Sequence, residues 1–175
     1  MAVHRILQLG DPILRHISWP VAHATSAHAT IRDLRDTLHE FQRTHGFGRG
    51  ISAIQIGSPL RVIYLEFEGA ELPLINPEYE WLSEEKFRLW DDCFSFPDLL
   101  VWLERSQSLR LRYTDPHGHH QTLDAAGPLA ELIQHEMDHL DGILAIDRAI
   151  PPHGLATREE WTRQTRTMAA ASPRA

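Results

Sequence analysis

Apolar residues recur at helical spacing near the start of the chain. Between residues 26 and 44 they repeat every three or four positions, at Ile31, Leu34, Leu38 and Phe41. A helix brings side chains with this spacing onto one face, which can then pack against a core. The pattern therefore predicts an amphipathic helix over this stretch.

Strand patterns occupy the middle of the chain. Residues 61–67 read as a strand, residues 72–75 and 79–82 predict further strand segments, and residues 109–113 alternate between apolar and polar side chains. Residues 115–118, Asp-Pro-His-Gly, predict a turn, so we expect the neighbouring His119 and His120 to lie at an exposed hairpin tip. Helices and strands in a chain of 175 residues predict one domain of the α+β class.

A second helix is predicted from Pro128 to Gly142, and it carries the most informative motif of the chain. Proline suits a first helical position and glycine suits the left-handed residue that ends a helix. Between them stands His-Glu-x-x-His, in which His135 and His139 share one helix face and can bind one metal ion together. Glu136 lies beside them, where a carboxylate can take a proton from water.

A histidine pair needs a third ligand, and two readings stay open. Metzincins carry a third histidine where this chain has Ala145, which excludes that class. A zincin-type metalloprotease would use Glu159 or Glu160, although the helix-breaking sequence 150–154 intervenes. Cys93 is the only cysteine and cannot form an internal disulfide, so we favour it as the ligand.

Composition narrows the class of protein. The net charge is −7 without a basic block, which gives no electrostatic support for nucleic-acid binding. The chain has no apolar run of about 18 residues, the length of a membrane span. Its start lacks the apolar core of a signal peptide, and its single thiol suits a reducing compartment, so we expect a cytoplasmic protein.

Three motifs in order give the chain a resemblance to the peptide deformylase family. Residues 48–55 are similar to the family's Gly-x-Gly-Φ-Ala-Ala-x-Gln, residues 91–95 to Glu-Gly-Cys-x-Ser, and residues 135–139 to His-Glu-x-x-His. The resemblance implies an α+β fold with mixed or antiparallel sheets packed around a central helix that carries the metal motif. We expect a deformylase-like domain over residues 1–152. The tail, residues 153–175, is expected to hold a short helix at 159–168 and a frayed end from residue 169.

The resemblance also implies an activity and a cofactor. It implies a metal-dependent hydrolase that removes the N-formyl group from N-formylmethionyl peptides of nascent proteins. One divalent metal ion is expected per chain, Fe²⁺ in the cell, with Zn²⁺ or Ni²⁺ as substitutes in preparations. The implied ligands are Cys93, His135 and His139.

Further roles follow from the same resemblance. Glu136 is the implied base, and Gln55 and the backbone N–H of Phe94 are the implied donors to the oxyanion on the formyl oxygen. The backbone of Gly48, Arg49 and Gly50 is implied to pair with the substrate as an added strand. Asp91, Asp138 and Arg105 are expected to support the metal ligands, with a surface ion pair as the alternative for the last two.

Several positions depart from the family pattern. Asp92 replaces a glycine, Ser52 an alanine, Arg49 an apolar residue, and Phe94 a smaller side chain. The ligands, base and amide donor are all kept, so these changes predict retained chemistry with altered specificity. The alternative substrate is a different N-formylated compound. Otherwise we expect a monomer in the bacterial cytoplasm that acts on formylated peptides at the ribosome and binds neither nucleic acid nor membranes.

Overall fold

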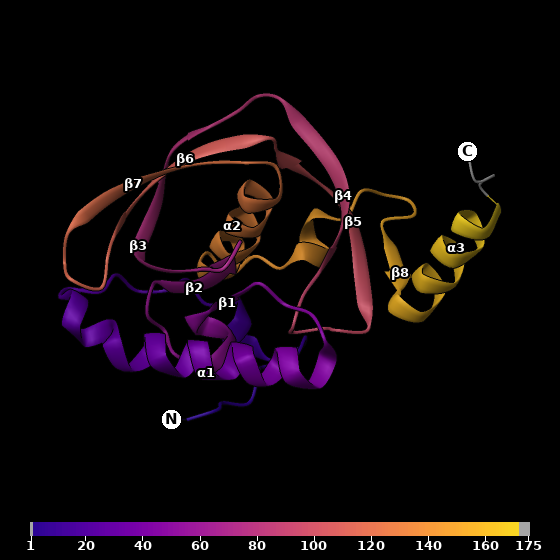
Figure 1. Cartoon of the computed structure of the whole chain (residues 1–175). Helices are drawn as coiled ribbons and strands as arrows, with labels where there is room; N and C mark the ends of the chain where they lie inside the picture. The colour runs from indigo at the N-terminus through magenta and orange to yellow at the C-terminus, as the bar shows by residue number, and fades with distance from the viewer. Residues whose placement is uncertain (1, 172–175) are drawn as a thin grey trace.

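The structure is a computed structural model that describes residues 2–171 of the chain. Two antiparallel sheets and three α-helices form it (Figure 1). One sheet has the strand order β1-β2-β3-β6-β7 and the other β4-β5-β8. The elements are β1 (Gly50–Ser52), β2 (Val62–Phe67), β3 (Ala70–Leu82), β4 (Lys86–Asp92), β5 (Leu99–Ser106), β6 (Ser108–Thr114), β7 (His120–Ala126), β8 (Leu155–Thr157), α1 (His28–His45), α2 (Gly127–Leu140) and α3 (Arg158–Ala171).

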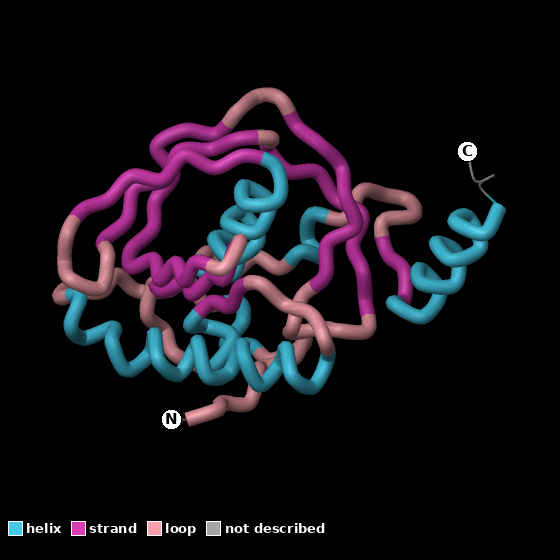
Figure 2. Tube along the Cα trace, in the orientation of Figure 1, coloured by secondary structure: helices cyan, strands magenta, loops and turns pink. Residues whose placement is uncertain are grey.

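Helix α2 occupies the centre, with strands of both sheets around it (Figure 2). It contacts β1, β2, β6 and β7 of the first sheet and β5 of the second. All eleven residues from Ala130 to Leu140 are buried. The α+β class and the central helix with the His-Glu-x-x-His motif are therefore confirmed, but the expected single buried face is wrong. Because α2 is enclosed, each charged side chain on it needs a partner inside the protein.

The first predicted helix is confirmed with a later start. A 3₁₀ turn covers Ala24–Ala27, and α1 begins at His28 rather than near residue 26. Leu34, Leu38 and Phe41 are buried. The helix ends at Gly46, whose φ of 78° is the left-handed conformation that glycine adopts without strain.

The two strand segments predicted at 72–75 and 79–82 are one strand, β3. The first half of β3 pairs with β2 and the second half with β6. The pairing of β3 with β6 has two register shifts, and the first, between Ile75 and Glu78, includes Asn76, which has a φ of 51°. The Asn76 side chain bonds to the backbone N–H and C=O of Val21, each at 2.8 Å, which compensates for the interrupted ladder.

The other local predictions for the central region agree with the structure. The turn at 115–118 is closed by a 2.9 Å bond from the Gly118 N–H to the Asp115 carbonyl, and His119 and His120 are exposed beside it. Pro128 lies in the first turn of α2, and Gly142 has a φ of 71° beyond its end.

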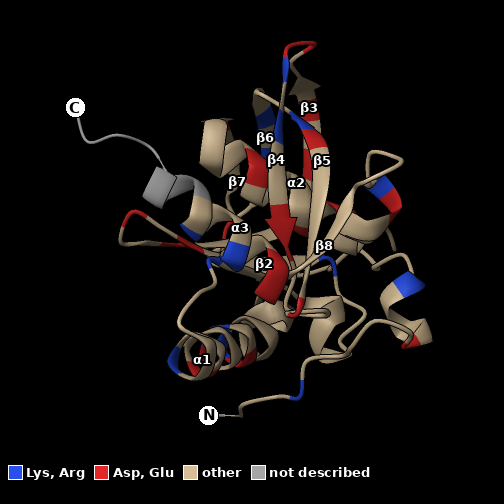
Figure 3. Cartoon of the chain, turned by 90° about the vertical axis from the view of Figure 1, so that its right-hand side faces the viewer, with Lys and Arg blue, Asp and Glu red and all other residues tan. Residues whose placement is uncertain are grey.

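The C-terminal segment contains one strand and one helix. Strand β8 was not predicted; it is three residues long and pairs with β5. Helix α3 covers the predicted helix at 159–168 and includes residues 169–171, which were expected to be frayed; residues 172–175 lie outside the described range. Figure 3 shows basic and acidic residues interspersed on the face that carries β4, β5 and α3. Of the helices in residues 2–171, none combines the length and apolarity of a membrane span.

Candidate functional site

Cys93, His135 and His139 meet in the interior. Cys93 directly follows β4, whereas both histidines project from α2. The Cys93 Sγ lies 3.2 Å from the His139 Nε2, and candidate ligand atoms of the three residues lie within 4.8 Å of one another. The fold thus joins a thiol and two imidazoles that the sequence separates widely.

This donor set fits a divalent transition metal. A thiolate with two imidazoles suits zinc, iron, cobalt or nickel. Asp91 accepts the Nδ1–H of His135 at 2.9 Å, which orients this ring. Burial acts to lower the pKa of His135, but Asp91 and Cys93 raise it well above its usual value, so a metal must displace the proton on the other ring nitrogen to bind there. Burial and the nearby His135 lower the pKa of His139 well below its usual value, so this ring stays neutral, the form that binds metals.

A series of ion pairs with alternating charges leads to His135 through Asp91. Arg105 bonds to Asp91 at 3.0 Å and also to Asp138, which in turn accepts from the Arg148 Nε at 2.6 Å. Arg105, Asp91 and Asp138 are buried, so the alternative of a surface ion pair is wrong. The sequence analysis missed Arg148, because the 3₁₀ turn Ala145–Arg148 brings it to its partner Asp138.

Glu136, also on α2, lines a pocket that we call the central pocket. Burial raises the pKa of this carboxyl to about 7, against the opposing effect of His135. Ser52, at the end of β1, places its hydroxyl 2.5 Å from the Glu136 Oε2. A carboxyl with this pKa can both accept and release a proton near neutral pH.

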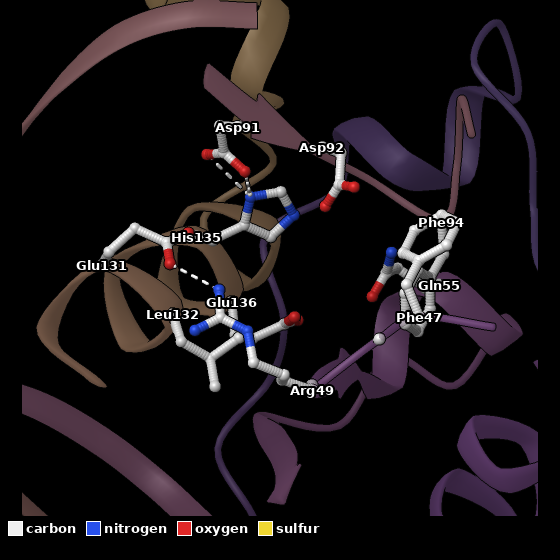
Figure 4. Close-up of a pocket in the computed structure, with 12 residues that line it drawn as sticks. Phe47, Arg49, Gln55, Asp91, Asp92, Phe94, Glu131, Leu132, His135 and Glu136 are labelled. Atoms are coloured by element: carbon white, nitrogen blue, oxygen red, sulfur yellow. Dashed lines mark hydrogen bonds and ion pairs between the residues drawn. The ribbon is translucent and has the colours of Figure 1, made fainter. Parts of the chain in front are cut away.

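The central pocket has a volume of about 480 Å³ and is shown in Figure 4. His135 and Glu136 lie between its two sides. Arg49 and Glu131 form one side, and Phe47, Asp92 and Phe94 lie on the other. The pocket is lined by Phe47, Gly48, Arg49, Gly50, Gln55, Asp91, Asp92, Phe94, Glu131, Leu132, His135 and Glu136.

The Arg49–Glu131 pair makes one side of the pocket polar. The Arg49 Nη2 lies 2.7 Å from the Glu131 Oε2, and the Glu131 carboxylate is buried. Burial and Asp91 raise the pKa of Glu131, while Arg49 opposes them. Glu131 was not singled out in the sequence, because its position on a predicted amphipathic helix reads as solvent-exposed.

Strand β1 offers an edge to the pocket. It is the outermost strand of the five-stranded sheet, and the preceding Gly48 and Arg49 line the pocket with Gly50. An edge strand carries backbone N–H and C=O groups that an extended peptide can pair with.

Gly50 must lack a side chain for Glu136 to keep its place. A Cβ at Gly50 would lie 2.9 Å from the Glu136 Oε1 and 2.7 Å from the Leu65 Cδ2. We expect Gly50→Ala to lower the turnover of this site by about 100-fold, because small displacements of a catalytic group cost that much. The measurement is kcat/KM together with the melting temperature. Gly57→Ala is the control: its Cβ meets no atom within 4 Å, so it reports only the strain of a φ of 80°.

Gln55 is oriented by its own turn. It lies in the 3₁₀ turn Ala53–Ile56, and its Oε1 accepts from the Ser52 N–H at 2.9 Å. Its Nε2 therefore points toward the Cys93 Sγ at 3.7 Å and the Ser95 Oγ at 3.3 Å. An amide fixed in this way can present a donor to a ligand in the central pocket, which Gln55 lines.

The glutamates of the metalloprotease reading lie elsewhere. Glu160 is half-buried on α3, where its carboxylate bonds to Arg163 at 2.7 Å. Over residues 2–171, the groups that can hold a metal combine Cys93 with the two histidines, or Asp91 with Glu131 and His135, and neither includes Glu159 or Glu160.

Known proteins match most of the chain. The family model described as Polypeptide deformylase matches residues 3–154. The peptide deformylase of Bartonella tribocorum is 40% identical over 154 residues, 84% of either chain, and that of Rhizobium meliloti is 39% identical over 152 residues, 84% of this chain and 85% of the relative. The crystal structure of the Thermotoga maritima peptide deformylase superposes with a TM-score of 0.80 at 31% identity, covering 86% of this chain and all of that one. The Acinetobacter baumannii enzyme with Met-Ala-Ser bound gives 0.74 at 28% identity, covering 84% and 98%.

Proposed function

Because the chain belongs to the polypeptide deformylase family, we propose that it is a peptide deformylase, a metal-dependent hydrolase that removes the N-formyl group from N-formylmethionyl peptides of nascent proteins. The observation that carries the proposal is the convergence of Cys93, His135 and His139 at the central pocket, which His135 and Glu136 line.

The proposed metal ligands are the Cys93 thiolate and the two imidazoles. A bound divalent ion would act as a Lewis acid and lower the pKa of water at the site. We propose Fe²⁺ as the ion in the cell, with Zn²⁺ or Ni²⁺ as substitutes, since all three accept sulfur and nitrogen ligands.

The remaining chemistry belongs to side chains of this protein. Glu136 takes a proton from the attacking water, whose oxygen bonds to the formyl carbon. The Gln55 amide and the Phe94 N–H donate to the negative charge that develops on the formyl oxygen. Glu136 then delivers its proton to the amine as the C–N bond breaks, and formate and the free amino terminus are released. Gly48, Arg49 and Gly50 hold the peptide as an added strand.

The Arg49–Glu131 pair favours a second candidate within the same chemistry, an N-formylated substrate with a polar first side chain. A methionine side chain on this side of the pocket would face the Arg49–Glu131 ion pair. Burying an apolar chain against a charged pair forfeits part of the hydrophobic gain.

One assay separates the two candidates. The purified enzyme loaded with Fe²⁺ is given formyl-Met-Ala-Ser and matched peptides in which glutamine or lysine replaces methionine, with acetyl-Met-Ala-Ser as the control for acyl selectivity. Preferred release of formate from the methionine peptide supports the first candidate, and preference for a polar residue supports the second. Formate release from none of them would refute the proposed function.

Arg105→Ala should loosen the proposed metal site and destabilise the fold. It leaves the buried Asp91 and Asp138 without their shared cation, which commonly costs about 3–5 kcal/mol of unfolding free energy. Loss of support for His135 should weaken metal retention by about 10–100-fold. Urea denaturation and metal content after dialysis measure the two effects. Arg110→Ala removes only an exposed pair with Asp124 and serves as the control. Unchanged metal retention in Arg105→Ala would contradict the supporting role.

We infer that the enzyme works as a monomer in the bacterial cytoplasm, on formylated chains as they leave the ribosome. The bacterial sources of its relatives support this setting. Analytical ultracentrifugation and co-sedimentation with ribosomes test it.

A further inference from the structure

Arg158, in the C-terminal segment, contacts two residues that line the central pocket, Asp92 and Phe47. Arg158 begins α3 and lies beyond the span of residues 3–154 that the family model matches. Its Nη2 lies 2.7 Å from the Asp92 Oδ2, its Nε donates to the Pro97 carbonyl at 2.6 Å, and its backbone N–H donates to the Asp98 carbonyl at 2.8 Å.

The same guanidinium covers an aromatic ring of the pocket. The Arg158 Cζ lies over the Phe47 ring, 4.3 Å from its centroid, a cation–π contact. Asp92 and Phe47 both line the pocket, on the side away from Glu131 (Figure 4). Arg158 therefore contacts this wall from outside without lining the pocket.

Phe47 depends on side-chain contacts for its position. It lies in the connection between α1 and β1, between Gly46 and Gly48, which have φ values of 78° and 126°. No strand or helix fixes this stretch. The Phe47 ring meets Phe41 and Phe94 edge-on, at 5.3 and 6.2 Å between centroids. His45 also meets this ring edge-on, at 6.3 Å between centroids, and Arg158 adds the cation–π contact from the C-terminal segment.

Arg158 is itself held in register by β8. Thr157 pairs with Leu99, and the next residue is Arg158. The Arg158 side chain is 30% exposed and the Asp92 side chain 38% exposed, so their ion pair is partly shielded from water. Asp92 is a departure from the family pattern at this position, and Arg158 supplies the charge that balances it.

We propose that Arg158 is a positioning residue that holds Phe47 and Asp92 as the outer wall of the pocket, so that the C-terminal segment contributes to peptide affinity. The inference rests on the proposed function for its substrate, although not for its geometry. Arg158 does not touch the reacting atoms, so its loss should change KM rather than kcat.

Arg158→Ala tests this in the metal-loaded full-length enzyme with formyl-Met-Ala-Ser. We expect KM to rise by about three- to tenfold with kcat unchanged, within the range of a partly shielded cation–π contact and ion pair. The KM of Arg158→Lys should lie between those of the wild type and Arg158→Ala, because lysine restores the charge but not the planar group that covers Phe47. In the Phe47→Leu background, Arg158→Ala should have a smaller effect than in the wild type, since the two residues act together.

Arg163→Ala is the matched control, on the same helix with an exposed pair to Glu160. An equal rise in KM for Arg163→Ala, or an unchanged KM for Arg158→Ala, would overturn the proposal. Calorimetric titration with the product tripeptide Met-Ala-Ser separates this failure from failure of the proposed function. If the protein binds the tripeptide but releases no formate, the proposed function is refuted. Weaker tripeptide binding by Arg158→Ala would then still support the proposed role of Arg158 in positioning Phe47 and Asp92. A wild-type protein that does not bind the tripeptide overturns the inference as well.

Discussion

Glu136→Gln is expected to lower kcat on formyl-Met-Ala-Ser by about a thousandfold, because loss of a general base costs about 10²–10⁴-fold. Glutamine has nearly the same shape as glutamate. Its amide oxygen can still accept the hydrogen bond that the Ser52 hydroxyl donates to the Glu136 Oε2 at 2.5 Å. The fold and the metal ligands should therefore be unaffected. Steady-state kinetics, with metal content measured on the same preparation, separates loss of the base from loss of the ion.

Glu131→Gln is the matched control for this result. Glu131 is also a buried carboxylate that α2 presents to the central pocket, yet its partner is Arg49 rather than a reacting group. Its loss should change peptide preference and leave most of kcat. If Glu136→Gln retains kcat as well as Glu131→Gln does, Glu136 is not the base.

Cys93→Ser is expected to remove the metal. A serine hydroxyl stays protonated near neutral pH, whereas a thiol beside a metal deprotonates outright. Loss of a residue that supports a ligand typically weakens metal retention by about 10–100-fold, and loss of the ligand itself should weaken it further. Formate release should fall as metal is lost. The measurement is metal per chain after dialysis against a chelator, followed by the formate assay.

Glu160→Gln is the control for the Cys93 variant and also tests the metalloprotease reading. Glu160 bonds to Arg163 on the surface of α3, so its loss should leave metal content unchanged. A protein that keeps its metal as Cys93→Ser and loses it as Glu160→Gln would refute the proposed ligand set.

The sequence was informative where chemistry depends on neighbours along the chain. His135 and His139 are four residues apart on a predicted helix, and that spacing alone places them together. Cys93 was recognised by its chemistry and by the family motif. Gln55 followed from the same resemblance, and its orientation comes from a hydrogen bond to Ser52, three residues earlier.

The missed residues depend on contacts between distant segments. Arg148 and Arg158 were not singled out, since their partners Asp138 and Asp92 come close only in the folded protein. Helical periodicity treats one face of α2 as exposed, whereas both sheets enclose it, so a buried Glu131 could not be anticipated. Strand β8 is too short for a two-residue alternation to stand out.

The enclosure of α2 has a consequence for how the enzyme exchanges its metal. A helix with neighbours on every side cannot separate from the protein by a local opening, so its amide hydrogens should exchange with solvent only through global unfolding. Two of the three proposed ligands belong to this slowly exchanging helix. The ion must then enter and leave through the mouth of the pocket, and a bound peptide, lying across β1, would close that route. Substrate should therefore slow the loss of metal to a chelator in the native enzyme.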